Sequence, residues 1–425
     1  MKKVLIIAPY FIPRRRVGAL RPFKFVKYLE KFGWKPSVLS IDEGNSKITD
    51  LELKSLEGIN TFKLKPPIDR TSTPQKKKRT FSKKKKENKF AKIVDDNFPI
   101  DTWLPFFWLK KKEINQIIKK VDPDIIWSTS DPWSGGYIAG KIAKKLNKKW
   151  VADFRDPWTL CNVRFLKKNK LAQLFEKRAE RWVIENADYM TFTSKATERK
   201  YNNHYPSLSN KTETIYNSFD FDFETSSNLL PNNSNKLNIL FLGTFRWLSD
   251  AKLIIDILER VKIRAPELFP NIELSSYGTL EGDDYLLAKE KRVLDVFKVR
   301  SKVPNEEVQN EISKSDILLL STHSKRDDIV PAKLLDYLPS TKPIISIAQN
   351  KEVEKILTKT GRGVQFQEGE IQEASELIIN CIQAKRDKKE LILKLNPRSD
   401  EIQKFHAKYT TQQLAKILTN ISESE

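Results

Sequence analysis

The sequence predicts an α/β protein made of two similar halves, each a doubly wound parallel sheet with helices on both faces. Short apolar runs typical of buried strands alternate with helical patterns along the chain, and this alternation stops once and then restarts. The interruption, residues 226–238 (SSNLLPNNSNKLN), is rich in Ser and Asn and has no periodicity, as expected of a linker. With 425 residues the chain can hold two or three domains.

The first half, residues 1–222, opens with an apolar strand at 3–8, a loop and a helical pattern over 23–34 that ends near Gly33. Further strand-like runs lie at 36–41, 124–128, 149–154 and 189–193, and helical patterns lie at 134–146 and 169–186. Residues 65–95 combine prolines with a lysine-rich run, so we expect a flexible basic insertion there.

The linker at 223–236 leads into a second half over 237–399. Its strand-like runs lie at 236–243, 271–278, 296–303, 316–322 and 342–348, with helices from about 250 and after Pro331. Residues 400–425 are predicted to form a final helix. Its spacing leaves open whether this helix returns to the first half.

Composition excludes several classes of protein. The 39% hydrophobic and 10% aromatic content argues for a folded chain. Cys161 and Cys381 form neither a CxxC pair nor a disulfide framework, which suits a reducing compartment. The apolar start ends at Pro9 and is followed by three arginines, so it predicts a buried strand in place of a signal peptide, and no uncharged run is long enough to span a membrane. We therefore expect a cytoplasmic protein.

The formal net charge of +22 predicts an anionic partner. Residues 76–92 contribute ten Lys or Arg against one acid, and the aromatic stretch 103–108 is followed by three lysines at 110–112. These features favour peripheral binding to the inner face of an anionic membrane. The alternatives are a solvated loop with 103–108 in the core, or nucleic acid, which ranks lower because no zinc-finger, RRM or helix-turn-helix signature is present.

Ligands of parallel α/β sheets bind beyond the carboxyl ends of the strands. After the first strand, Gly18 precedes a predicted helix whose first turn includes Arg21, a combination suited to an anion, although a plain turn is the alternative. After the strand at 149–154, Asp153, Arg155 and Asp156 place charge at the sheet edge. A buried Arg–Asp pair that fixes the loop would explain them equally well.

The second half has a denser group of candidates in DDIVPAKLLDYLPS. Pro331 suits the first position of a helix, which leaves backbone N–H groups at Ile329 and Val330 for a phosphate, and Asp328 and Asp336 can accept hydrogen bonds from sugar hydroxyls. Together they suit a sugar joined to a nucleoside diphosphate. The alternative is a helix cap and a surface carboxylate.

The order of these motifs resembles a bacterial branch of glycosyltransferase family four. The resemblance lies in YFIPRRRVGALRPFKFVKYLEKFGW, DTWLPFFW, STSDPWS, VADFRDPW, ADYMTFTS, FLGT, SDILLLS and VPAKLLDYLPSTKPI, and it leaves out only about 65–95 and 222–236. It implies a GT-B fold, with two Rossmann-like domains facing each other across a cleft. It also implies a retaining enzyme that transfers a sugar from a nucleotide-sugar donor.

The resemblance assigns donor-site roles in the second half. Asp328 and Asp336 fall on the E-x7-E motif, where the first acid holds sugar hydroxyls and the second the ribose. Lys333 matches a frequent lysine, and the loop after Gly243 supplies diphosphate-binding cations, here Arg246 and Lys252 at altered spacing. Gly18 and Arg21 would belong to the acceptor or cleft loop.

The first half departs from the family pattern. Arg155 stands where many relatives have a His, and the three histidines, His204, His323 and His406, lie off that motif. An Asp (Asp153 or Asp156) or the departing phosphate must then take the acceptor's proton. Tyr216-Asn217-Ser218 replaces a Pro-Asn-Gly turn.

Two Asp-x-Asp pairs, at 122–124 and 220–222, are candidate metal ligands, but the resemblance implies no metal and no further cofactor. We therefore expect a metal-independent hexosyl or related glycosyl transfer to a glycan or lipid-linked acceptor, in surface polysaccharide biosynthesis. The alternatives are an inactive sugar-binding or nucleotide-binding protein of the same fold and a nucleic-acid-binding protein.

Overall fold

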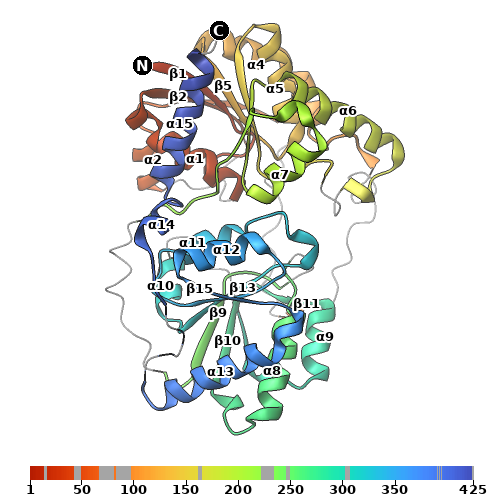
Figure 1. Cartoon of the computed structure of the whole chain (residues 1–425). Helices are drawn as coiled ribbons and strands as arrows, with labels where there is room; N and C mark the ends of the chain where they lie inside the picture. The colour runs from red at the N-terminus through yellow and green to blue at the C-terminus, as the bar shows by residue number, and fades with distance from the viewer. Residues whose placement is uncertain are drawn as a thin grey trace. The chain divides into compact units, whose positions relative to one another are not determined.

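The computed structural model describes residues 1–425 apart from 14–16, 43–48, 67–80, 83–96, 161–164, 222–233, 246–248, 302–306, 390, 392, 394 and 424–425. The chain forms two compact units (Figure 1). Unit 1 comprises the described residues of Met1–Gln75, Glu87–Asp220 and Phe405–Glu425, and unit 2 those of Lys76–Lys86 and Phe221–Lys404. Each has its own parallel sheet, which confirms the predicted fold class. No helix in the described part of the chain is long and apolar enough to cross a membrane.

Unit 1 contains a seven-stranded sheet in the order β3-β2-β1-β5-β6-β7-β8. Its strands are β1 (Lys2–Ile7), β2 (Trp34–Ile41), β3 (Asn60–Leu64), β5 (Ile125–Thr129), β6 (Lys149–Phe154), β7 (Tyr189–Phe192) and β8 (Thr212–Thr214). Its helices are α1 (Val17–Leu29), α2 (Asp50–Ser55), α4 (Leu104–Val121), α5 (Trp133–Lys145), α6 (Lys170–Asn186), α7 (Lys195–His204) and α15 (Ala407–Glu423).

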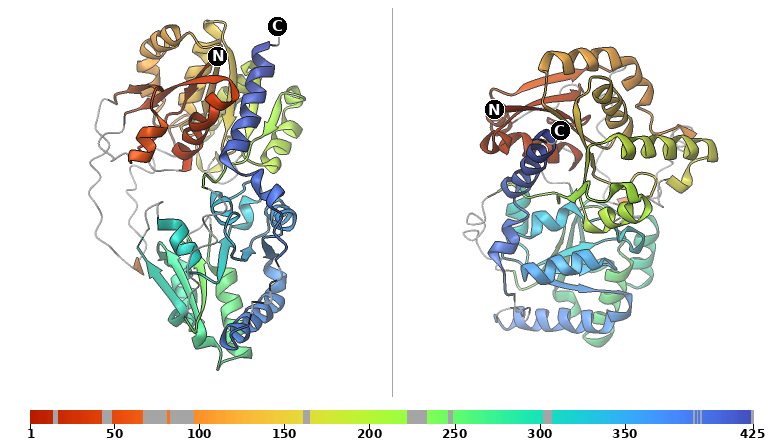
Figure 2. Two further views of the ribbon diagram at one scale, coloured as in Figure 1. Left: turned by 90° about the vertical axis from the view of Figure 1, so that its left-hand side faces the viewer. Right: turned by 45° about the horizontal axis from the view of Figure 1, so that its top comes forward.

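Both faces of this sheet are covered. Helices α4, α5 and α6 bury one apolar face of the sheet, and α1 and α15 bury the other. The C-terminal helix α15 runs beside α1 (Figure 2), with Leu414 and Leu418 fully buried against a core that includes Phe25 and Trp34. Residues from the two ends of the sequence therefore complete one core.

Unit 2 contains a six-stranded sheet in the order β12-β10-β9-β13-β14-β15. Its strands are β9 (Leu237–Phe241), β10 (Ile272–Tyr277), β12 (Phe297–Arg300), β13 (Ile317–Ser321), β14 (Ile344–Ile347) and β15 (Gly363–Phe366). Its helices are α8 (Lys252–Arg264), α9 (Gly282–Glu290), α10 (Val308–Ser313), α11 (Ala332–Tyr337), α12 (Lys351–Thr360), α13 (Ile371–Arg386) and α14 (Ser399–Gln403). A separate two-stranded ladder joins β11 (Leu280–Glu281) to β4 (Phe81–Ser82), which lies within the predicted basic insertion. The rest of its lysine run, 76–92, lies outside the described residues.

Two helix starts differ from the prediction. Helix α1 begins at Val17, so Gly18 is its second residue and Arg21 lies in its second turn. The sequence suggested a later start, but helix α1 already includes Pro22, whose nitrogen cannot donate a hydrogen bond to the Gly18 carbonyl. Helix α11 begins at Ala332, with Pro331 in an extended conformation before it, and has only six residues.

The strand order reverses between β1 and β5 in unit 1 and between β9 and β13 in unit 2. Ligands of open parallel sheets bind at such points because the loops leave in opposite directions and part from each other. The segments after these four strands contain Gly18, Asp131, Gly243 and Asp328. The fold thus brings predicted site residues to the reversal point of each sheet.

Candidate functional site

In unit 1, the guanidinium group of Arg155 lies at the edge of the sheet between two carboxylates. Its Nη2 is 3.8 Å from Oδ2 of Asp131, and its Nε is 3.5 Å from Oδ2 of Asp156. Both Asp side chains are partly exposed, whereas Arg155 is mostly buried. Asp131 is not among the site residues predicted from the sequence.

Gly18 provides the space for this guanidinium. A Cβ atom at position 18 would lie 1.8 Å from Nη1 of Arg155, a distance that no real contact reaches. Gly18 is therefore needed for close packing against Arg155. Whether an anion also binds at this helix start, as the sequence suggested, stays a prediction.

The triplet Asp-Pro-Trp occurs after both β5 and β6, at 131–133 and 156–158. The indole rings of Trp133 and Trp158 stack with their centroids 4.9 Å apart and their planes 11° from parallel. Because β5 and β6 are neighbouring parallel strands, the two triplets occupy equivalent places. Their tryptophans form an apolar base, and their aspartates both reach Arg155. The repeated triplet is the signal that would have predicted Asp131.

Asp153 and Arg21 form a buried pair in place of a reactive group. Nε and Nη2 of Arg21 donate to the two carboxylate oxygens of Asp153, at 3.1 and 2.9 Å, and its Nη1 donates to the Tyr216 carbonyl at 3.0 Å. The hydroxyls of Thr129 and Thr191 also donate to Asp153, each at 2.7 Å. With four donors on a carboxylate that is 1% exposed, Asp153 joins α1 to the ends of three strands. We therefore assign Asp153 and Arg21 a positioning role in place of the predicted catalytic and acceptor roles.

The loop after β6 is fixed to α6 by two buried carboxylates. Glu176 accepts a hydrogen bond from the indole of Trp158 at 3.1 Å and pairs with Lys168. Glu180 accepts from the backbone of Thr159 at 2.9 Å and from the hydroxyl of Tyr201 at 2.5 Å. Burial raises the pKa of Glu180 despite these donors. These hydrogen bonds fix the loop that carries Asp156 to α6.

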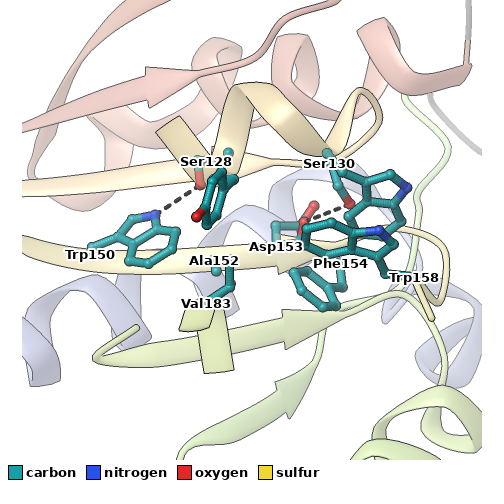
Figure 3. Close-up of a pocket in the computed structure, with 11 residues that line it drawn as sticks. Ser128, Ser130, Trp150, Ala152, Asp153, Phe154, Trp158 and Val183 are labelled. Atoms are coloured by element: carbon teal, nitrogen blue, oxygen red, sulfur yellow. Dashed lines mark hydrogen bonds between the residues drawn. The ribbon is translucent and has the colours of Figure 1, made fainter. Parts of the chain in front are cut away.

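A cavity of about 10 Å³ lies beneath this loop (Figure 3). Its lining includes Ser128, Ser130 and Asp153, together with the aromatic rings of Trp150 and Trp158. The Ser128 hydroxyl accepts from the indole of Trp150 at 2.9 Å. A volume near that of one water probe is far too small for a sugar. The cavity therefore belongs to the packing of the loop.

In unit 2, Lys333 lies against the turn that follows β9. Gly243 has a φ of +153°, and a Cβ there would lie 2.2 Å from Nζ of Lys333. The same ammonium lies 4.1 Å from the centre of the Phe241 ring. A glycine thus lets a cation approach the backbone at the reversal point of the sheet.

Helix α11 is held over the sheet by Tyr337. Its buried hydroxyl accepts a hydrogen bond from the Leu242 amide at 2.9 Å and donates to the Leu319 carbonyl at 3.3 Å. Burial raises the pKa of this phenol, so it stays neutral. One side chain thus links α11, which carries Lys333 and Asp336, to the turn after β9 and to strand β13.

The remaining donor-site candidates lie on the segment before α11 and in the turn after β9. Asp328 is 8% exposed with its Oδ1 3.9 Å from Nε of Arg326, and Asp336 is partly exposed. Val330 is buried, and the Ile329 carbonyl accepts from the Asn350 amide at 2.8 Å, so this segment is anchored to the start of α12. Helix α11 has only six residues, and the assignment of the amides of Ile329 and Val330 to a phosphate stays a prediction.

Two predicted cations remain without support from the structure. The side chain of Lys252 is exposed at the first position of α8. Arg246 lies outside the described residues.

The predicted Asp-x-Asp pairs have structural contacts of their own. Asp122 pairs with Lys148 at 2.6 Å, and Asp124 accepts from the backbone of Lys3 at 2.6 Å. Asp220 accepts from Lys27 at 2.8 Å and from Tyr28 at 2.6 Å, while Asp222 lies outside the described residues.

Comparison with known families identifies both halves. The model of Glycosyltransferase Family 4 matches residues 73–223, and that of Glycosyl transferases group 1 matches residues 222–394. Together they span more than half of the chain. No curated protein sequence matches it.

Solved structures show the same fold at low sequence identity. A glycosyltransferase from Rickettsia africae superposes with a TM-score of 0.61 at 15% identity, over 100% of this chain and 99% of that one. Sucrose-phosphate synthase from Thermosynechococcus elongatus has a TM-score of 0.63 at 14% identity and covers 99% of both chains. HepE of Anabaena, in complex with UDP, has a TM-score of 0.64 at 13% identity, over 99% of this chain and 100% of that one. With both family matches and two doubly wound domains, the chain is a glycosyltransferase of the family 4 type with the GT-B fold.

Proposed function

We propose that this glycosyltransferase moves a sugar from a nucleoside-diphosphate sugar to a glycan or lipid-linked acceptor with retention, in surface polysaccharide biosynthesis, without a metal. The position of Lys333 against Gly243 carries the donor part of the proposal. In this arrangement a positive charge stands beside a partly exposed glycine at the reversal point of the sheet.

A diphosphate leaving group suits this place. Charge develops on the departing phosphate, and a fixed ammonium stabilises it without having to reorganise. The residue at 243 has no side chain, so the ammonium of Lys333 can lie at the turn where we place the phosphate. HepE has been solved with UDP and with UDP-glucose, so UDP-sugars are the first donors to test.

Asp328 and Asp336 then bind hydroxyls of the nucleotide sugar. A carboxylate only accepts hydrogen bonds, which suits the vicinal hydroxyls of ribose and of a sugar. We assign the ribose to Asp336 on α11 and the transferred sugar to Asp328. Both are one methylene shorter than Glu, so each must approach its hydroxyls more closely.

The exposed carboxylates of unit 1 are assigned to the acceptor. Asp131 and Asp156 flank Arg155 and remain partly exposed, whereas Asp153 is already occupied by four donors. Asp156 or the departing phosphate therefore takes the acceptor's proton. Arg155 holds both carboxylates in place.

Initial rates of transfer from a panel of nucleotide sugars test this proposal. Replacing Lys333 with Ala should lower the rate about tenfold or more, because one such interaction is worth at least ~1.4 kcal/mol in the transition state. Lys355→Ala, on the exposed side of α12, is the matched control and should leave the rate unchanged. Equal rates for the two variants would reject the role of Lys333.

A further inference from the structure

Helix α6 and the short 3-10 helix before it, η2 (Phe165–Lys167), expose an unusual number of large apolar side chains. Figure 1 shows α6 projecting from the other helices of unit 1. The exposed fractions are 64% for Leu166, 65% for Leu171, 45% for Leu174 and 50% for Phe175. Leu171, Leu174 and Phe175 are spaced by three and four residues, so they share one face of the helix. We call this surface, with Leu166, the outer face of α6.

The charged side chains around the outer face are mostly basic. Lys167, Lys170, Lys177, Arg178 and Arg181 are exposed. The two acids in this stretch, Glu176 and Glu180, are fully buried. The next acid, Glu185, is exposed near the end of α6, but the exposed Lys and Arg side chains outnumber it. The outer face therefore combines apolar side chains with a local positive charge.

These two acids are buried because they form hydrogen bonds with a loop of unit 1. Glu176 and Glu180 are one turn apart and hold Trp158 and Thr159 in the loop after β6. A surface helix normally turns its acids to water and its apolar side to the core. In α6 both acids point inward and hold the loop after β6, while large apolar side chains face outward. Such a surface on a protein marks a binding face.

We infer that the outer face of α6 docks on an anionic lipid bilayer. Leu and Phe side chains insert at the headgroup level, and lysines and arginines around them bind anionic headgroups. The inference rests on the proposed function only in that a lipid-linked acceptor gives the docking a purpose. Because the opposite face of α6 holds the loop of Asp156, docking would fix the height of the acceptor carboxylates above the membrane.

The stretch 103–108, which the sequence suggested for membrane contact, mostly belongs to the core. Phe106 and Phe107 are buried, and Trp103 and Leu104 pack partly against the same core. Of its aromatic side chains only Trp108 is largely exposed, at 52%, followed by Leu109 at 76%. The larger apolar surface of unit 1 is therefore on α6.

Cosedimentation of the full chain with vesicles tests the docking. The probes are vesicles of phosphatidylcholine with and without phosphatidylglycerol. The wild type should bind only the anionic vesicles and should dissociate at high salt. The double variant Phe175→Gln, Arg178→Gln should bind at least about fivefold more weakly. Leu53→Gln, Lys54→Gln, which removes an exposed leucine and a lysine from α2 of the same unit, should bind like the wild type.

Three results would overturn the inference. The first is equal binding of both double variants. The second is loss of binding only when the lysines of 76–92 are neutralised. The third is no vesicle binding by the wild type, which would leave an acidic protein as the occupant. Stabilisation of each variant by a nucleotide sugar is measured in parallel. A failure of docking with intact donor binding is thereby separated from a failure of the proposed function.

Discussion

The guanidinium group of Arg155 fills the space that a side chain on Gly18 would occupy, with Nη1 1.8 Å from the position of a Cβ atom. Helix α1 can approach the loop after β6 only because residue 18 has no side chain. Gly18 therefore makes room for a cation at the edge of the unit 1 sheet. This contact makes the position of Arg155 testable without changing Arg155 itself.

Gly18→Ala should displace Arg155 from Asp131 and Asp156 and lower transfer about tenfold or more, because misplacement of about 1 Å at a reacting site costs that much or more. Gly136→Ala is the control, since a Cβ there would meet only the Ser128 hydroxyl at an ordinary 3.5 Å. Initial rates of transfer are measured for both variants, and circular dichroism verifies that each is folded. Equal activity of the two variants would show that the position of Arg155 does not matter.

Asp328→Asn and Asp336→Asn should each lower transfer about tenfold or more while the fold stays intact, because an amide replaces one acceptor oxygen by a donor. Asp327→Asn, at an exposed neighbouring position, should behave like the wild type. The expected pattern is a raised KM for the nucleotide if Asp336 holds the ribose, and a lowered kcat if Asp328 holds the transferred sugar. Unchanged kinetics in both variants would reject the donor assignment.

Stability should depend on pH through Asp284. Burial, with smaller contributions from Asp250 and Asp283, raises the pKa of Asp284 to about 6, although its carboxylate accepts a hydrogen bond from the Ala251 amide at 3.1 Å. A carboxyl whose pKa is higher in the folded state stabilises the fold below the unfolded pKa near 4. That stability is lost as the pH rises through about 6.

Asp284→Asn keeps an acceptor for the Ala251 amide and removes the charge. It should therefore unfold at a higher temperature than the wild type at pH 8 and at about the same temperature at pH 4. Because Asp284 is partly exposed, the gain at pH 8 should be on the order of 1 kcal/mol. Thermal unfolding across this pH range measures it. A constant difference between the two proteins would contradict the raised pKa.

Treatment with a chelator should leave transfer largely intact, because the proposal assigns leaving-group charge to Lys333. The assay compares rates with and without EDTA and after adding Mg²⁺ or Mn²⁺. A strict metal requirement would return attention to the Asp-x-Asp pairs and reject the proposed mechanism.

The sequence predicted the fold well because strands of a parallel sheet are buried on both faces and appear as continuous apolar runs, as in 149–154 and 316–322. It also placed Asp328, Lys333 and Asp336 on one segment. It did not reveal that Asp153 binds Arg21, because those residues are 132 positions apart and meet only through the packing of α1 against β6. Periodicity likewise did not show that Glu176 and Glu180 face inward, since that depends on the loop they hold.

The central claim is that a nucleotide sugar binds where Lys333 meets Gly243, and thermal unfolding with a panel of nucleotides and nucleotide sugars tests it most directly. A ligand at about 100 times its Kd stabilises by ~2.7 kcal/mol, so a true donor should raise the unfolding temperature of the wild type and of Lys355→Ala clearly. The same donor should give little or no shift with Lys333→Ala. A full shift in Lys333→Ala, or no shift of the wild type with any nucleotide or nucleotide sugar, would contradict the account.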